Sequence, residues 1–303
     1  MGKLSMKRVE IAAPLSERKR IMETLQRRGV VELKDCTGDG LLKMKTAESM
    51  SLFDKACGEA MAARVVLTEY LPAEKKSMFS GFSSNMRAME SADFDEQVLK
   101  AEKILVKCHY VNNLHAAVKE AYAEIARLQT KTDQLHPWEA LDIPMDFAGT
   151  EACAVFIGSV PYHCSAGDIM EKLACDSAEV EVVSAFPELS NLFVICYKED
   201  ADQAYRALRG IGFSKPGDPP HCLPAEQMAL HEKDMIRLRG EIKTNEDAIR
   251  ACRGMEGEIE FLIDYYGMRK DKYEALGSLG MTGNAFVAEG YIPEKYVQPC
   301  GRA

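Results

Sequence analysis

The chain has 303 residues, of which 47% are hydrophobic and 28% are charged. This composition is ordinary for a folded globular protein, and it excludes a disordered chain, a collagen-like chain and a small disulfide-stapled domain. Lys and Arg number 38 against 47 Asp and Glu, a net charge of −9, so non-specific binding of nucleic acid, which needs a basic surface, is not expected. The ten cysteines form no C-x-x-C pair, and no apolar segment follows the charged residues 1–9. Both features indicate reduced thiols in a soluble chain without an export signal.

The N-terminal segment predicts a strand, a helix and a second strand. Residues 7–13 alternate polar and apolar side chains, as a half-buried strand does. Ser16 is a suitable N-cap for the helix that follows, Gly29 is a natural stop after that helix, and residues 30–33 form the second strand. A β-α-β start needs further strands to make a stable sheet. The strand predicted over residues 285–293 has no neighbour downstream, so we expect it to pair with this N-terminal unit.

Two long segments carry the apolar spacing of paired helices. A first helix is expected over residues 45–71, followed by a break over residues 73–92. Beyond the break, residues with spacings of three and four continue for more than five heptads as a first seam: Val98, Ala101, Leu105, Cys108, Val111, Leu114, Val118, Ala121, Ile125, Leu128, Thr132 and Leu135. A second seam has the same spacing: Met228, His231, Met235, Leu238, Ile242, Asn245, Ile249, Cys252, Met255, Ile259, Leu262 and Tyr266. Each seam extends over about 60 Å, so we expect an antiparallel two-helix coiled coil in which Asn245 fixes the register. A compact helical bundle is the alternative.

The segment between the seams, residues 151–222, has the order β-α-β-β-α-β, which is the ferredoxin-like arrangement. The predicted fold class is therefore α+β: two ferredoxin-like lobes joined by a long antiparallel two-helix coiled coil, in an elongated molecule. The predicted domains are a proximal lobe, outgoing helices with a corner, a distal lobe and a returning helix, at residues 1–44 with 280–303, 45–150, 151–222 and 223–279.

Sequence motifs of catalysis are absent. No phosphate-binding loop, dinucleotide fingerprint, zinc-protease motif or nucleophile elbow occurs. The best metal candidates are His163 and Cys164 with Cys175, and His221 with Cys222, but their spacings match no common zinc pattern. We therefore predict no catalytic residue, no cofactor and no metal. Helix surfaces or seams are the expected places for three further histidines: His109, His115 and His231.

Charge is distributed unevenly along the chain. Residues 136–222 hold 5 Lys and Arg against 14 Asp and Glu, a net charge of −9, whereas residues 1–43 hold 10 basic and 6 acidic groups, a net charge of +4. Such asymmetry concerns partners rather than fold. The acidic lobe is either a solvated surface or a docking surface for a basic partner. Its candidate partner-binding residues are Glu171, Asp176, Glu179, Glu181, Glu199 and Asp202.

Several segments together resemble one family. Residues 135–143 resemble the Leu-x-Pro-Trp-x-x-Leu-Asp corner of the stator subunit of V-type ATPases, called subunit I in bacteria and archaea and subunit a in eukaryotes. Residues 156–161 are similar to the tip-lobe strand of that family. Residues 286–294 resemble its Gly-Trp-Val-Pro return strand, with Tyr291 where the family usually has Trp. The opening residues 6–11 also fit, and the matches follow the family's order along the chain.

The resemblance implies a non-catalytic arm at the cytoplasmic face of a membrane. In the family, this arm links peripheral stalks to the ion-translocating sector and resists torque while ion transport is coupled to ATP hydrolysis or synthesis. The implied partners are E/G-type helical heterodimers of the stalks at both lobes, together with the protein's own membrane domain and the rotor ring. The parent protein would be an integral membrane protein and this fragment soluble.

Two other functions remain open from the residues themselves. The β-α-β-β-α-β order also occurs in regulatory ligand-sensing modules with ACT-like lobes, and fold alone does not choose between the functions. A nucleic-acid-binding coiled-coil arm is the second alternative, which the acidic middle lobe argues against. Trp138, the single tryptophan, follows the end of the first seam, and we expect it to anchor the corner between coiled coil and lobe.

Overall fold

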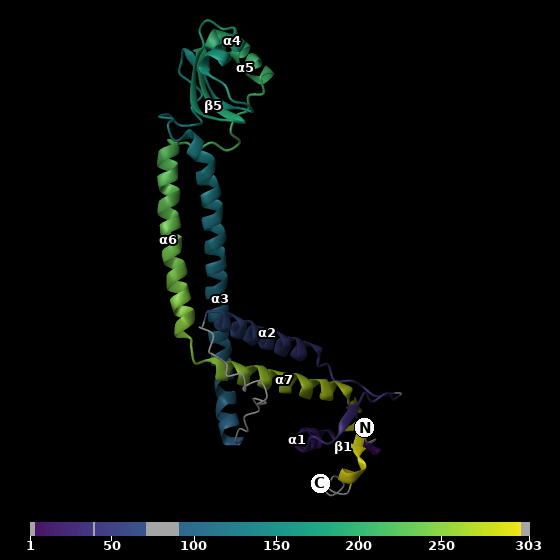
Figure 1. Ribbon diagram of the computed structural model, residues 1–303. Helices are drawn as coiled ribbons and strands as arrows, with labels where there is room; N and C mark the ends of the chain where they lie inside the picture. The colour runs from purple at the N-terminus through teal and green to yellow at the C-terminus, as the bar shows by residue number, and fades with distance from the viewer. Residues whose placement is uncertain (1–3, 39, 71–90, 298–303) are drawn as a thin grey trace. The chain divides into compact units, whose positions relative to one another are not determined.

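The computed structural model mixes α-helices with two antiparallel β-sheets (Figure 1). It describes residues 4–38, 40–70 and 91–297. The break predicted over residues 73–92 lies outside the described residues, apart from its last two positions, which belong to a helix. Among the helices of the described ranges, none is both long and apolar enough to cross a lipid bilayer. The chain divides into two compact units, formed by Met1–His115 with Glu246–Ala303 and by Ala116–Asn245.

The first unit contains a sheet built from the two ends of the described chain. Strands β1 (Met6–Pro14) and β2 (Glu32–Lys34) pair with opposite sides of β7 (Ala285–Pro293). The short β6 (Gly280–Met281) also pairs with β7, and every pair is antiparallel. The prediction that the late strand returns to the N-terminal β-α-β unit is therefore confirmed.

Helix α1 (Arg18–Arg28) connects β1 to β2 and covers one face of this sheet. Gly29 ends the helix with a φ of 59°, a left-handed conformation that glycine adopts without steric cost. The predicted N-cap role of Ser16 is wrong, because Ser16 lies inside a 3-10 turn (Leu15–Glu17) and α1 begins after that turn without a side-chain cap. Met22 of α1 packs into a core with Leu279, Phe286 and Ala288.

Three helices of the first unit share one apolar core: α2 (Ala47–Tyr70), the first part of α3 (Ser91–Leu135) and α7 (Glu256–Ser278). On α2 this core contains the fully buried Ala60 and Ala63 together with the larger Val66 and Leu67. The short alanine side chains allow the neighbouring helices to approach closely at that point.

The returning helix is broken, contrary to the single helix predicted over residues 223–279. Helix α6 (Pro224–Ala251) ends in a turn, and α7 begins at Glu256. Gly254 in this turn has a φ of 101°, which an α-helix cannot contain. All predicted residues of both seams are nevertheless buried or partly buried, including Met255 inside the turn.

In the second unit, the end of α3 and the start of α6 pack side by side and run in opposite directions (Figure 1). Their shared core consists of Val118, Ala121, Leu128, Met235, Leu238 and Ile242, with Ile125 at its margin. This pairing confirms the predicted antiparallel seam within this unit. We call the paired segments the hairpin.

The sheet of the second unit has three strands, in the order β3-β5-β4. Its elements are β3 (Cys153–Val160), α4 (Ala166–Leu173), β4 (Glu179–Phe186), β5 (Leu189–Tyr197) and α5 (Ala201–Gly210). A capping box between Ser165 and Asp168 starts α4. The predicted last strand is reduced to a single bridge between Ser214 and Ser159. Two complete ferredoxin-like lobes are therefore not confirmed among the described residues.

Both faces of this three-stranded sheet are covered. Successive strand residues point to opposite faces. Phe156 and Val194 face α4 and α5, whereas Val155 and Ile195 face the end of the hairpin. Strands β3 and β5 accordingly read as mainly apolar runs, which is typical of strands buried on both sides, whereas the edge strand β4 alternates and keeps Glu179 and Glu181 exposed.

Candidate partner-binding surface

The corner between hairpin and sheet is a compact apolar cluster. Helix α3 ends at Leu135, and the 3-10 turn His136–Trp138 follows it, with Pro137 inside. Trp138 is only 5% exposed. It packs with Leu135, Leu141, Met145, Val155 and Ile157, and so contacts both the helix end and the sheet. The predicted anchoring role of Trp138 is confirmed by this packing.

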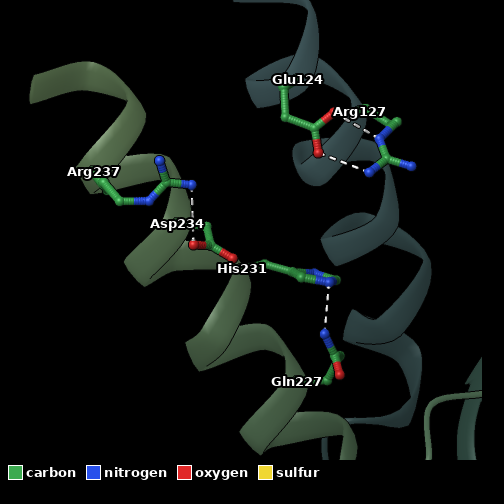
Figure 2. Close-up of polar contacts among 6 residues, drawn as sticks. All are labelled: Glu124, Arg127, Gln227, His231, Asp234 and Arg237. Atoms are coloured by element: carbon green, nitrogen blue, oxygen red, sulfur yellow. Dashed lines mark hydrogen bonds and ion pairs between the residues drawn. The ribbon is translucent and has the colours of Figure 1, made fainter. Parts of the chain in front are cut away.

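One polar layer interrupts the apolar hairpin. Thr132 on α3 and His231 on α6 are both seam residues, and both are buried. Nδ1 of His231 lies 3.1 Å from Oγ1 of Thr132. The other ring nitrogen, Nε2, lies 2.8 Å from Nε2 of Gln227 (Figure 2). A neutral imidazole satisfies both contacts, because the Gln227 amide donates to Nε2 while Nδ1–H donates to Thr132.

The surroundings of His231 favour its neutral form. Burial lowers the pKa of His231, and the nearby cations Lys131 and Arg127 lower it further, while Asp234 opposes the shift. Figure 2 shows that Arg127 is paired with Glu124 on its own helix, and that Asp234 faces Arg237. We expect the polar layer to be uncharged at neutral pH.

A cavity of about 690 Å³ lies beside this layer, between the end of the hairpin and the loop over residues 216–222. Its lining includes Trp138, Gln227, His231 and His221. His221 is exposed, and its hydrogen bond to Asp146 raises the pKa of its imidazole. The cavity is therefore mixed in character, with one buried and one exposed imidazole in its lining.

The metal candidates do not assemble into a site. Cys164 is buried in the apolar core under α4 and α5, and Cys175 lies 3.3 Å from the hydroxyl of Ser177. Cys222 contacts the side chain of Gln227 at 3.3 Å. Within the ranges that the structure describes, no three or more His, Cys, Asp or Glu side chains are grouped so that they could hold a metal ion.

The structure places all six candidate acids on the surface of the second unit: Glu171 on α4, Asp176 before β4, Glu179 and Glu181 on β4, Glu199 after β5 and Asp202 on α5. The antiparallel register brings the start of β4 beside the end of β5, since Glu179 pairs with Ile195. The end of α4 and the start of α5 meet at the same place, because Gln203 donates to the carbonyl of Ala174. All six acids therefore lie toward one end of the sheet.

These acids do not share one face. Glu179 and Glu181 lie opposite Ile195 and Phe193, which face the hairpin side of the sheet. Glu171 and Asp202 are on the two helices that cover the other side. The acidic surface consequently wraps around the open edge of β4. A partner that contacts all six residues would have to cover this edge.

Sequence reasoning missed the polar layer. Thr132 and His231 were both recognised as seam positions, but 99 residues separate them, so only the helix register shows that they face each other. The signal was present in the sequence, because each is a polar residue in an otherwise apolar stretch of its seam.

Of the comparisons with known proteins, the one with solved structures finds matches. No protein-family model matches the chain, and no curated protein does. Among solved structures, the crystal structure of the cytoplasmic N-terminal domain of subunit I, homolog of subunit a, of V-ATPase is similar over 97% of this chain and 97% of that chain, with 14% identity and a TM-score of 0.47. The sequence motifs described above resemble the same subunit.

Proposed function

We propose that this chain is a non-catalytic arm of a rotary V-type ATPase, which links peripheral stalks to the membrane sector and resists torque. The observation that carries the proposal is the apolar joint at Trp138, which fixes a folded lobe to the end of a helical hairpin. An arm that transmits force needs stiff elements with stiff joints between them. A close-packed apolar joint is stiff because protein interiors are packed as densely as organic crystals.

In this arm, the proximal lobe would comprise residues 1–44 and 280–303, and the distal lobe residues 151–222, with helices between them. E/G-type stalk heterodimers would bind both lobes at the cytoplasmic face of the membrane. The remaining partners would be the parent protein's own membrane domain and the rotor ring, with no nucleic acid involved.

For the distal lobe, we propose that the acidic end of the sheet receives a basic end of a stalk helical pair. Exposed charges act mainly on the encounter rate of two proteins, and salt screens them, since the Debye length falls from about 30 Å at 0.01 M to about 8 Å at 0.15 M. Neutralising the two acids on β4 should therefore slow association more than it speeds dissociation.

The test is stopped-flow binding of a purified stalk heterodimer to the chain at two salt concentrations. The variant carries Glu179→Gln with Glu181→Gln. Its control is Glu188→Gln, measured also against Glu179→Gln alone so that one charge is removed in each, because Glu188 is also exposed but lies in the β4–β5 turn at the other end of the same sheet. At low salt, a lower association rate for the double variant than for the control supports docking at this end. Equal rates for both would remove these acids from the docking surface, and a failure of the stalk to bind wild-type chain would refute the arm function.

The cavity beside His231 favours a second candidate function, a ligand-sensing module. Its size suits a small molecule, and its buried imidazole and glutamine amide could orient polar groups. Titration of the chain with the twenty amino acids, followed through Trp138 fluorescence, tests this alternative because Trp138 lines the cavity. Saturable quenching by one amino acid would favour a sensor, and no response to any of them would leave the arm as the supported function.

A further inference from the structure

The net charge of +4 over residues 1–43 has no assigned role in the proposed function. Part of this basic segment lines a cavity of about 550 Å³ in the first unit, formed by α1, α7 and Met44 of the segment before α2. Four cations line the cavity: Arg18, Lys19, Arg269 and Lys272. Among the described residues, no Asp or Glu belongs to this lining. We call it the cationic cavity.

Helical spacing separates the charges of α7 by sign. Tyr265, Arg269 and Lys272 follow one another at intervals of four and three residues, so they lie on one face of the helix, and all three line the cationic cavity. Two acids of the same turns, Asp271 and Glu274, line a separate cavity on another side of α7. The face of α7 toward the cationic cavity is therefore basic and aromatic, although α7 as a whole is rich in acids.

Both arginines of the cavity are partly buried and bind only weak or neutral acceptors among the described residues. Arg18 donates to the thioether sulfur of Met281 at 3.4 Å, and sulfur is a weak acceptor. Arg269 donates to the phenol oxygen of Tyr265 at 2.8 Å, and its guanidinium lies 4.8 Å from the ring centre of Phe53. A partly buried charge without a charged partner is costly. An anion in the cavity would supply strong, charge-assisted acceptors to both.

The two lysines of the cavity are more accessible. Lys19 is exposed on the first turn of α1. Lys272 contacts Glu23 of α1 at 3.4 Å, in a pair whose two side chains are 32% and 38% exposed. Partly exposed pairs of this kind contribute little net stability, so Glu23 does not prevent Lys272 from contacting a ligand. A solvated basic patch would account for the lysines but not for the two partly buried arginines.

The rest of the lining indicates the class of ligand. Met22, Met44 and Leu276 supply an apolar wall, and the phenol of Tyr273 lies beside them. The volume of about 550 Å³ is that of a small-molecule site, which typically combines apolar walls with a few convergent polar groups. One phosphate group carries about −1.5 to −2 charges at neutral pH, so one or two phosphates would balance the excess of cations. A phosphorylated organic compound fits both parts of the lining.

We propose that the cationic cavity binds a phosphorylated organic compound, with its phosphate groups on the four cations and its apolar or aromatic part against Met22, Met44 and Leu276. This inference does not rest on the arm function. Free nucleotides and the headgroups of phosphate-bearing lipids share this chemistry, so separate probes distinguish the two sources.

The first arm titrates the whole chain with ADP, and separately with pyrophosphate and with adenosine, which are the two parts of ADP. Binding is followed by methionine methyl NMR. Met22 and Met44 line the cationic cavity, whereas Met235 is buried in the hairpin of the second unit and serves as the internal reference. ADP should shift the methyls of Met22 and Met44, leave Met235 unchanged, and bind more tightly than either of its parts. Adenosine that binds as tightly as ADP would overturn the role of the cations.

Two charge reversals on the same helix provide the matched comparison. Lys19→Glu changes an exposed residue that lines the cavity, so the core stays intact. Arg27→Glu changes an exposed residue of α1 that does not line it. At low salt, Lys19→Glu should weaken ADP binding about tenfold, because it places a negative charge where a positive one faced the phosphates, and Arg27→Glu should have a much smaller effect. Equal effects of the two reversals would overturn the proposal, since they would show only the influence of net charge.

The second arm uses vesicles made of phosphatidylcholine and phosphatidic acid in equal amounts, with vesicles of phosphatidylcholine alone as the control. Co-sedimentation of the chain with the acidic vesicles, lost in Lys19→Glu and retained in Arg27→Glu, would support the site and identify a lipid headgroup as the source of the phosphate. Binding of ADP without such co-sedimentation would support the site and identify a free compound. If ADP leaves the methyls of Met22 and Met44 unshifted and Lys19→Glu does not alter sedimentation, the proposal is refuted.

Discussion

Removal of the Trp138 indole is the sharpest test of the joint between hairpin and lobe. A buried aromatic side chain removes about 150–250 Å² from water, and at about 25 cal/mol per Å² this corresponds to about 4–6 kcal/mol as an upper estimate. Measured truncations of buried Phe and Trp to Ala cost about 3–5 kcal/mol. Because Trp138 is 5% exposed, Trp138→Ala should lower the stability of the second unit by about 3–5 kcal/mol.

Because the chain has two compact units, a single midpoint of unfolding would not report on the joint alone, so the assay is native-state hydrogen exchange read strand by strand. The free energy of opening at β3 should fall by about 3 kcal/mol or more, while that at β7 in the first unit should not change. The matched control is Phe147→Ala, because Phe147 is near the same corner but is 37% exposed and lies outside the cluster. A loss at β3 of under about 1 kcal/mol, or one equal to the loss in the control, would refute the reasoning that Trp138 holds the joint.

Three further predictions concern single features. Because burial lowers the pKa of His231, its neutral form stabilises the fold above the ordinary histidine pKa, and this contribution should be lost as the pH falls from about 6.5 through the lowered value. The drop in urea midpoint between pH 7.5 and pH 5 should therefore be smaller for His231→Gln than for wild type, and equal drops would contradict this. Gly290→Ala should cost about 1–3 kcal/mol, because a Cβ there would lie 2.3 Å from the carbonyl oxygen of Glu32 on β2, whereas Gly283→Ala, with open space around it, should be nearly neutral in the same urea titration. Hydrogen exchange should show the proximal sheet opening more readily than the distal one, since among the described residues α1 and the end of α7 pack on the proximal sheet, whereas two helices, α4 and α5, cover one face of the distal sheet; better protection of β1 and β7 than of β3 and β5 would contradict it.

The seams were predictable because burial along a helix follows a period that a sequence displays directly. The break in the returning helix was not. Ile249, Met255 and Ile259 keep the seam spacing across it, and all three are buried. The periodicity therefore continues through a turn whose backbone is not helical. Gly254 was the only local cue, and a single glycine is tolerated inside many helices.

Strand number proved harder to predict than strand order. The predicted final strand of the distal lobe exists only as the bridge from Ser214 to Ser159. Gly158 permits even this approach, since a Cβ there would lie 2.3 Å from the carbonyl oxygen of Ser214. Composition and alternation do not show how far such pairing extends, because pairing depends on the neighbouring backbone rather than on the strand's own residues.

For the candidate acids, too, one part of the arrangement was predictable from the sequence and another was not. Their exposure follows from charge alone, and Glu179 and Glu181 share a face because strand residues alternate. Their gathering at one end of the sheet depends on the register of β4 with β5, which sequence pattern did not specify.

The polar layer in the hairpin bears on how an arm could resist sliding of its helices. A seam of Leu, Ile, Met and Val tolerates a shift by one heptad, because one apolar side chain replaces another of similar volume. Such a shift would separate His231 from Thr132 and leave a buried imidazole nitrogen without a partner, which costs about 1–3 kcal/mol. The register role predicted for Asn245 stays a prediction, and Asn245 is partly buried, whereas His231 and Thr132 are both buried. Because a buried polar group loses more when its partner is removed, we expect the layer with His231 to oppose such a shift more strongly than Asn245 does, and in the proposed arm it would resist sliding of the helices under load.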